Sequence, residues 1–359
     1  PLKKYLKMIH YNNKGMLTLI LEWALEWPTA LAATEGDEKE RLCTKQAYDA
    51  WKSSIQAGAQ LGPATQRAIE LLSEVLSPDA LYPGLSARYR KEIDPGFKGA
   101  RTIAPNLLRA IGKAQKECAE VAFSGDADQF EKHFAEYMDF VRGIHDGVVQ
   151  YAQTYPTTVH QLLGQSAAEK MIEKSFSDCS FFELLWTLIH ALDSKELAAF
   201  YADHLRTHFS GQGRGGSVQV IEEADRYRLV FDACGSGGAM RRRLASASSP
   251  AEVLPQATPA TWSLAGQVPA YCSHCALNEI HSIERFGFPV AITEFDPDPS
   301  KPCGWTIYKD PHKIPDRYFE RVGKTKDPKQ FKKENWKYKI FRFLGITLKI
   351  KKRVTLPEL

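Results

Sequence analysis

The sequence has no apolar run long enough to cross a membrane. Its most apolar early stretch, residues 16–27, is short and carries Glu22 and Glu26, whereas a spanning helix needs about 20 predominantly apolar residues. The same stretch lacks the small-residue cleavage site of a secretory signal peptide. We therefore expect a cytoplasmic protein with no transmembrane segment.

A strong net charge is also missing. The 359 residues carry a formal net charge of +4, which is too small to indicate nucleic acid as a partner. The charge is uneven, however, because thirteen Lys and Arg stand against three Asp and Glu from residue 321 to the last residue. We expect residues 325–359 to form a basic tail, solvated or docked on its own protein, and contacts with a partner subunit or an anionic surface stay open.

Cysteine is scarce. The chain has seven cysteines, an odd number, and four of them cluster late in the sequence, between residues 234 and 303. A chain of this length buries a full core without disulfide bonds. The distribution argues against a disulfide scaffold and favours a reduced protein whose late thiols bind a metal.

Helical periodicity dominates the first part of the chain, which we predict as a helical domain over residues 1–209. Apolar residues recur at helical spacing in segments 65–76, 104–123, 127–151 and 181–209. Prolines and turn residues separate the segments. The main ones are Pro28, Pro63, Pro78, Pro95 and Pro156. We expect six or seven helices in an irregular bundle.

The pattern changes after a glycine-rich stretch at residues 210–216. This stretch lacks the Gly-Lys-Ser/Thr ending of a phosphate-binding loop, so we interpret it as a linker. Beyond it, residues 217–324 are predicted to form a smaller α+β metal-binding domain. Strands are expected at 217–221, 226–231, 289–295 and 305–309, with a helix at 271–286. The predicted fold class is therefore α+β.

The placement of four cysteines is the strongest chemical signal. Cys272-Ser-His-Cys275 has the spacing that lets two thiolates converge on one metal ion. Cys234 follows a predicted strand and Cys303 precedes another, both at turns that glycine and proline make permissive. Four thiolates complete a tetrahedral shell, so we predict zinc as the cofactor, ahead of iron or an iron–sulfur cluster.

Other interpretations of these cysteines stay open. They can be buried thiols without a ligand, because free cysteine is among the most buried residue types. Cys272 and Cys275 could form a redox pair, although the other thioredoxin-like elements are missing. Cys234, followed by Gly-Ser-Gly-Gly, could be a nucleophile with His274 or His281 as its base, but we favour glycines that simply make the turn.

The segment around the Cys-x-x-Cys pair also offers acid–base groups. In a helix, Glu279 lies one turn after Cys275, which would place a carboxylate beside a metal-site thiolate. We predict Glu279 and His281 as catalytic residues that move protons, while a role as polar-face residues stays equally open. The expected ligand-binding residues are Asp232, His274 and Trp305.

A second histidine pair precedes the linker. His204 and His208 are one helical turn apart, a spacing that can bind a metal. The Glu that follows the first His in the metalloprotease motif is absent, and cationic residues are common at helix C-termini. We interpret the pair as residues of a helix end.

One resemblance extends over residues 226–309. A thiol-bearing helix is followed by a strand pair that leads into Cys303-Gly-Trp-Thr-Ile307. This arrangement resembles the small-molecule-binding domain shared by 4-vinyl reductase-type proteins and L-2-amino-thiazoline-4-carboxylic acid hydrolase-like proteins. The resemblance implies a small ligand pocket beside a thiolate or zinc site and, in some members, ring-opening hydrolysis. The Cys-Gly-Ser-Gly-Gly turn and the large helical part depart from it.

Two hypotheses about function follow. The first is a metal-dependent enzyme, a hydrolase of a C–N or C–S bond in a small cyclic molecule, with its pocket between the two domains. The second is a non-catalytic ligand-binding or assembly module in which four thiolates close the shell of a structural zinc ion. The expected partner is a small molecule, and a homo-oligomer stays open.

Overall fold

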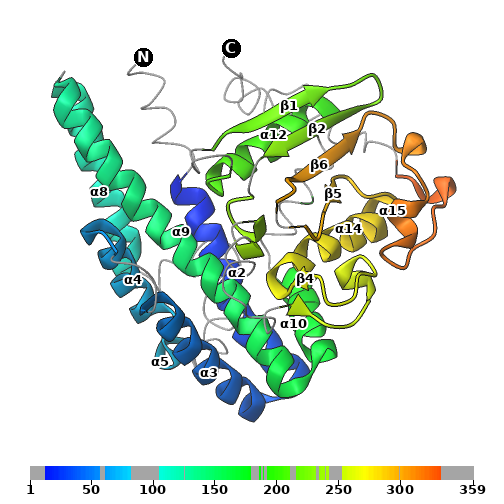
Figure 1. Ribbon diagram of the computed structural model, residues 1–359, viewed down its shortest axis with the longest axis horizontal. Coiled ribbons are helices and arrows are strands. Elements are labelled where there is room, and N and C mark those ends of the chain that lie inside the picture. The colour runs from blue at the N-terminus through cyan, green and yellow to red at the C-terminus, as the bar shows by residue number, and fades with distance from the viewer. Residues whose placement is uncertain are drawn as a thin grey trace. The chain divides into compact units, whose positions relative to one another are not determined.

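The protein consists of two compact units, Pro1–Phe181 and Phe182–Leu359. The computed structural model describes residues 13–56, 61–81, 105–124, 126–178, 186, 189, 192–210, 216–231, 234–238, 240–241, 253–298 and 300–332. The first unit is helical and the second adds a small sheet, which confirms the α+β class (Figure 1). The helix expected to end the helical domain lies in the second unit, because the division falls before it.

The first unit packs its helices around one long central helix. That helix, α9, begins after Asp126, whose carboxylate accepts a hydrogen bond from the Gln129 N–H as an N-cap. It contacts every long helix of the unit. The helices are α2 (Asn13–Glu35), α3 (Asp37–Gln56), α4 (Pro63–Val75), α5 (Pro78–Leu81), α8 (Pro105–Ser124), α9 (Ala127–Leu163) and α10 (Gln165–Asp178).

Two of the prolines expected to end helices lie inside them. Pro28 is within α2 and Pro156 is within α9. An interior proline removes one backbone hydrogen bond and costs about 3 kcal/mol in an exposed helix. Here Trp27 and Tyr155, the residues just before each proline, are fully buried. Their burial, together with that of their neighbours, offsets the cost, so the helices continue.

Helix length and hydropathy also bear on the membrane. None of the described helices is both long and apolar enough to span a bilayer.

A buried carboxyl group sits in the interior of the first unit. Glu40 on α3 is fully buried and accepts a hydrogen bond from Thr44 Oγ1 at 2.6 Å. The Thr44 hydroxyl in turn lies 2.9 Å from Tyr155 Oη on α9. Burial raises the pKa of Glu40, because a carboxylate loses hydration there.

The second unit is built on an antiparallel sheet with the strand order β1-β2-β6-β5. Each expected strand is present. The strands are β1 (Val218–Glu222), β2 (Arg226–Phe231), β5 (Ile292–Glu294) and β6 (Cys303–Tyr308), and a separate pair joins β3 (Val253–Leu254) to β4 (Val268–Pro269). Phe231 pairs with Cys303, so the end of β2 lies beside the beginning of β6. In this order β6, the last of the described strands along the chain, lies between β2 and β5.

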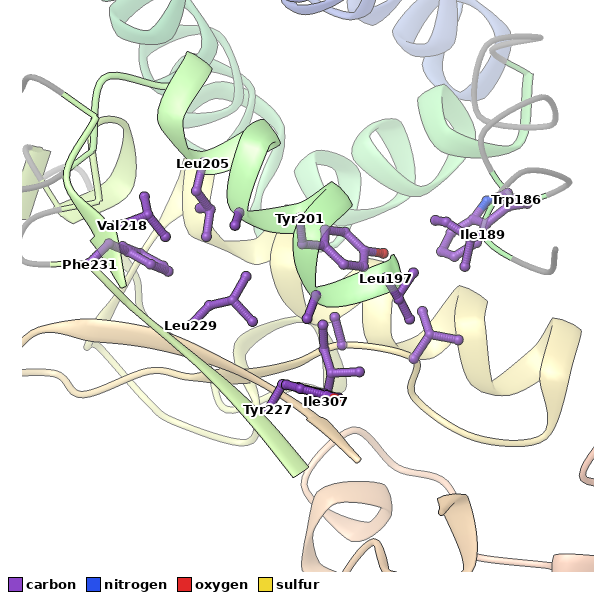
Figure 2. Close-up of a cluster of buried hydrophobic side chains, with 14 of the residues drawn as sticks. Trp186, Ile189, Leu197, Tyr201, Leu205, Val218, Tyr227, Leu229, Phe231 and Ile307 are labelled. Carbon is purple, nitrogen blue, oxygen red and sulfur yellow. The ribbon is translucent and has the colours of Figure 1, made fainter. Parts of the chain in front are cut away.

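Helix α12 (Ser194–Thr207) covers one face of this sheet. It begins with a capping box, in which Asp193 and Glu196 each accept a hydrogen bond from the other's backbone N–H. Its apolar side chains meet those of β1, β2 and β6 in one buried cluster (Figure 2). In this view Leu197, Tyr201 and Leu205 of α12 are drawn against Leu229 and Ile307 of the sheet. Because this packing fixes the helix, it also fixes the residues at its C-terminal end.

Helix α14 (Ser273–Phe286) follows the single-turn 3-10 helix Ala270–Cys272 and packs against β5. It confirms the helix expected at 271–286. It ends at Gly287, which adopts φ 85° as its C-cap. A short helix, α15 (Arg317–Glu320), comes later.

Candidate thiol and imidazole site

Four cysteines line one cavity of the second unit. The cavity has an empty volume of about 550 Å³ and is partly open. We call Cys234, Cys272, Cys275 and Cys303 the thiol cluster. The β2–β6 register brings Cys303 to the end of β2, which Cys234 follows within a few residues. Cys272 and Cys275 come from the start of α14. The site predicted from the cysteine spacing is thus brought together at one cavity.

The turn after Cys234 depends on its glycines. A Cβ on Gly235 would lie 1.6 Å from the His208 carbonyl oxygen, and one on Gly237 would lie 2.4 Å from Cys272 Sγ. The Gly235 N–H also donates to Ser210 Oγ at 3.1 Å. The turn therefore packs directly on the end of α12 and on the thiol cluster. This contact explains the glycines without an oxyanion hole.

The geometry of His274 fixes its tautomer. Its Nδ1 lies 2.5 Å from the Tyr271 carbonyl oxygen, which can only accept a hydrogen bond. Nδ1 therefore carries the proton, and Nε2 carries the lone pair. Cys275 Sγ lies 3.3 Å from that Nε2, so the thiol can donate to it. The cavity thus holds an imidazole nitrogen that can accept a proton or bind a metal.

Burial favours the uncharged form of three thiols of the cluster and of two imidazoles beside it. It raises the pKa of Cys272 to about 12 and raises the pKa of Cys275 and of Cys303 well above the ordinary value. Neighbouring thiols of the cluster raise these pKa values further, because several thiolates would repel one another. Burial also lowers the pKa of His204 and of His274 to about 4. An added cation would be the natural counter-charge for thiolates here.

The remaining cavity wall is aromatic, with one cation. Trp262 and Phe295 stack at 5.0 Å, and the guanidinium of Arg241 lies over Phe295 at 4.9 Å. Arg241 is almost fully buried and donates to the backbone carbonyls of Asp298 and Lys301. Tyr271, Phe231 and Trp305 complete this apolar lining. Such a wall suits a small molecule with a flat apolar part.

Two of the three predicted ligand-binding residues lie at the cavity. His274 and Trp305 line the cavity. Asp232 lies outside the described residues. Sequence reasoning also missed two lining residues, His204 and His208 at the end of α12. Their one-turn spacing was the available signal, but the interpretation as a helix end set it aside.

The predicted catalytic residues do not lie at the cavity. Glu279 is fully buried and accepts hydrogen bonds from Arg321 Nη2 at 2.8 Å and from the Thr293 N–H at 2.7 Å. His281 Nδ1 lies 3.7 Å from a carboxylate oxygen of Glu284. Neither residue is among those that line the cavity. Their catalytic role stays a prediction that the geometry of the cavity does not support.

Neither the arrangement of possible metal ligands nor a comparison with known proteins assigns a function to the cavity. Within the described part of the chain, no group of three or more His, Cys, Asp or Glu side chains is arranged to hold a metal ion. The metal-binding character of the second unit therefore stays a prediction. Comparison of the chain with protein-family models, curated proteins and solved structures gives no match.

Proposed function

We propose that the second unit is a metal-dependent enzyme acting on a small organic molecule, with zinc bound by the thiol cluster. The observation that carries the proposal is the convergence of four thiols and three imidazoles on one cavity. Sulfur and nitrogen are the donors that zinc prefers in proteins. Binding would require the thiol side chains to turn toward a common point, because no three of the described ligand side chains have that arrangement as placed.

Electrostatics support a cation at the thiol cluster. Buried thiols with raised pKa values are poor ligands until a metal displaces their protons. Arg241 is the cation in the cavity wall, and its charge lowers the pKa of Cys272 and of Cys303 against the effect of burial. One guanidinium balances only one thiolate. A divalent ion would balance two more and would thereby favour ionisation of the cluster in this buried place.

The room beside the cluster supports catalysis rather than a purely structural ion. The cavity is partly open, so a ligand can enter from solvent, and its aromatic wall suits a ring. A bound zinc ion supplies a water of lowered pKa or polarises a carbonyl group. His274 has the lone pair on Nε2, beside the Cys275 thiol, and would be a proton acceptor within the cavity. Hydrolysis of a C–N or C–S bond in a cyclic molecule is the reaction we propose, in line with the resemblance over residues 226–309.

Metal analysis of the purified chain tests the proposal. We expect about one equivalent of zinc or iron that depends on the thiol cluster. Cys303→Ser and Cys275→Ser should lose it, whereas Cys43→Ser and Cys118→Ser, in the first unit, should keep it. Native protein without metal, whose thiols all react freely, would contradict the proposal.

X-ray absorption at the zinc edge then separates an enzyme from a structural module. Three sulfurs with one oxygen, and without the outer-shell scattering of an imidazole, indicate a position held by water and support catalysis. Four sulfurs close the shell, and the non-catalytic ligand-binding or assembly module would then replace the enzyme at this ion.

A further inference from the structure

The imidazoles of His204 and His208 point at each other inside the same cavity. Their Nε2 atoms are 3.2 Å apart. Two nitrogens bound to one tetrahedral zinc ion, each at about 2.0–2.1 Å, lie about 3.3 Å from each other. The observed separation therefore matches the spacing that a shared ion imposes. A direct hydrogen bond between the rings gives a similar distance. Metal titration distinguishes that hydrogen bond from a site that two rings share around one ion.

The surroundings stack Trp305 on the His204 ring and bury His208. The His204 ring lies parallel to Trp305, with centroids 6.2 Å apart and planes inclined by 18°. His208 is buried, and the Gly235 backbone packs against its carbonyl group. Thr207 Oγ1 donates to the His204 carbonyl oxygen at 2.6 Å and so caps the last turn of α12. Fixed rings of this kind lose little entropy when they bind an ion.

We infer that His204 and His208 form a second ion position in the cavity, separate from the thiol cluster, which takes a borderline divalent cation such as Zn²⁺, Co²⁺ or Ni²⁺. Imidazole suits these ions. Two protein ligands leave two or more positions for water or for a donor atom of the substrate. This inference rests on the proposed function only for the catalytic use of the ion. The inference places the open coordination positions at the ion held by the imidazole pair. They would remain open there even if four thiolates closed the shell of the ion at the thiol cluster.

Equilibrium dialysis of the full chain against Co²⁺ tests the inference. We expect His204→Gln and His208→Gln each to weaken one Co²⁺ equivalent by about tenfold or more, while sulfur-to-cobalt charge-transfer absorption from the thiol cluster stays unchanged. His133→Gln is the matched control, because its half-buried ring lies on α9 of the first unit and faces the Gln129 carbonyl oxygen at 2.9 Å. Circular dichroism verifies that each variant folds.

A measurement on the unaltered chain makes the test independent of folding. Hydrogen–deuterium exchange at the imidazole C2–H, followed by mass spectrometry, should slow at His204 and His208 when Ni²⁺ is added and stay constant at His133. Unchanged exchange at the pair would overturn the inference. So would a single Co²⁺ equivalent that both the histidine and the cysteine variants remove, because the two positions would then be one. Absent charge-transfer absorption with an intact imidazole equivalent would instead count against the thiol cluster alone.

Discussion

Arg321 holds Glu279 from 42 residues away in sequence, with Nη2 at 2.8 Å from each carboxylate oxygen. The same nitrogen donates to the Thr293 carbonyl oxygen at 2.9 Å. The pair thus ties α14 and β5 to the segment after α15. A buried carboxylate with such partners acts as a structural link between elements, which differs from the catalytic role expected from its spacing to Cys275.

Glu279→Gln separates these two roles. If the pair is structural, the variant leaves the Arg321 charge without its counter-ion, and breaking a buried pair costs about 3–5 kcal/mol. We expect a large fall in the melting temperature of the second unit and partial recovery in the double variant Glu279→Gln/Arg321→Met. A variant with unchanged melting temperature, intact metal and lost turnover would restore Glu279 as a catalytic residue. Differential scanning calorimetry gives the first measurement.

The cysteines should respond unequally to a chelator. Metal binding free energy becomes folding free energy where the ligands are assembled only in the native state. We expect a strong zinc chelator to lower the melting temperature of the unaltered chain and of Cys43→Ser by the same amount. Cys272→Ser or Cys303→Ser should melt low with or without it. A chelator effect of equal size in all four proteins would remove the basis for a thiolate-bound metal. Cys179, the remaining cysteine, lies outside the described residues.

Glycine substitutions test the close packing around Cys234. Gly235→Ala would push a methyl group into the His208 carbonyl oxygen, and overpacking against backbone costs about 1–3 kcal/mol or more. Gly112→Ala in α8 meets no atom within 4 Å and should stabilise its helix by about 0.5–1 kcal/mol. Urea denaturation measures both. Equal effects of the two substitutions would mean that the turn does not pack on α12 as described.

The buried Glu40 predicts a pH dependence of the first unit. Its pKa is raised in the native state, so the folded chain binds this proton more tightly than the unfolded chain. The contribution to stability is complete below the unfolded pKa and is lost as pH rises through the folded one. Glu40→Gln stays neutral and can still accept from Thr44. We expect its stability to fall less than that of the unaltered chain between about pH 5 and pH 8.

Hydrogen exchange of α3 peptides measures this difference. Glu38→Gln, at an exposed position of the same helix, is the matched control and should keep the pH dependence of the unaltered chain. If Glu40→Gln and Glu38→Gln behave alike, the Glu40 carboxyl is not neutralised by burial.

Part of the fold and of the cavity could be predicted because it depends on residues that are close together in the sequence. The strands β2 and β6 and the helix α14 follow from period and turn residues, although β6 begins at Cys303 and not after it. The prolines misled the prediction, because tertiary burial around Pro28 and Pro156 outweighs a local preference. Glu279 shows a second limit. Spacing along one helix cannot reveal which face meets Arg321, a residue far along the chain.

The imidazole pair shows a third limit. The spacing of His204 and His208 is visible in the sequence, but a cavity beside them arises only when the 234–238 turn folds over the end of α12. Local spacing can propose such a pair and cannot choose between a solvent-facing helix end and a ligand site.

The inner position of β6 has a consequence for how the protein is made. During synthesis β1, β2 and β5 leave the ribosome before it, yet β2 and β5 do not pair with each other. Until β6 arrives, both expose unpaired backbone edges, which invite pairing with other chains. The same strand delivers the last cysteine of the cavity. Until Cys303 and β6 have been made, a nascent chain therefore carries three thiols of the cluster without the fourth, and β2 and β5 without their shared partner.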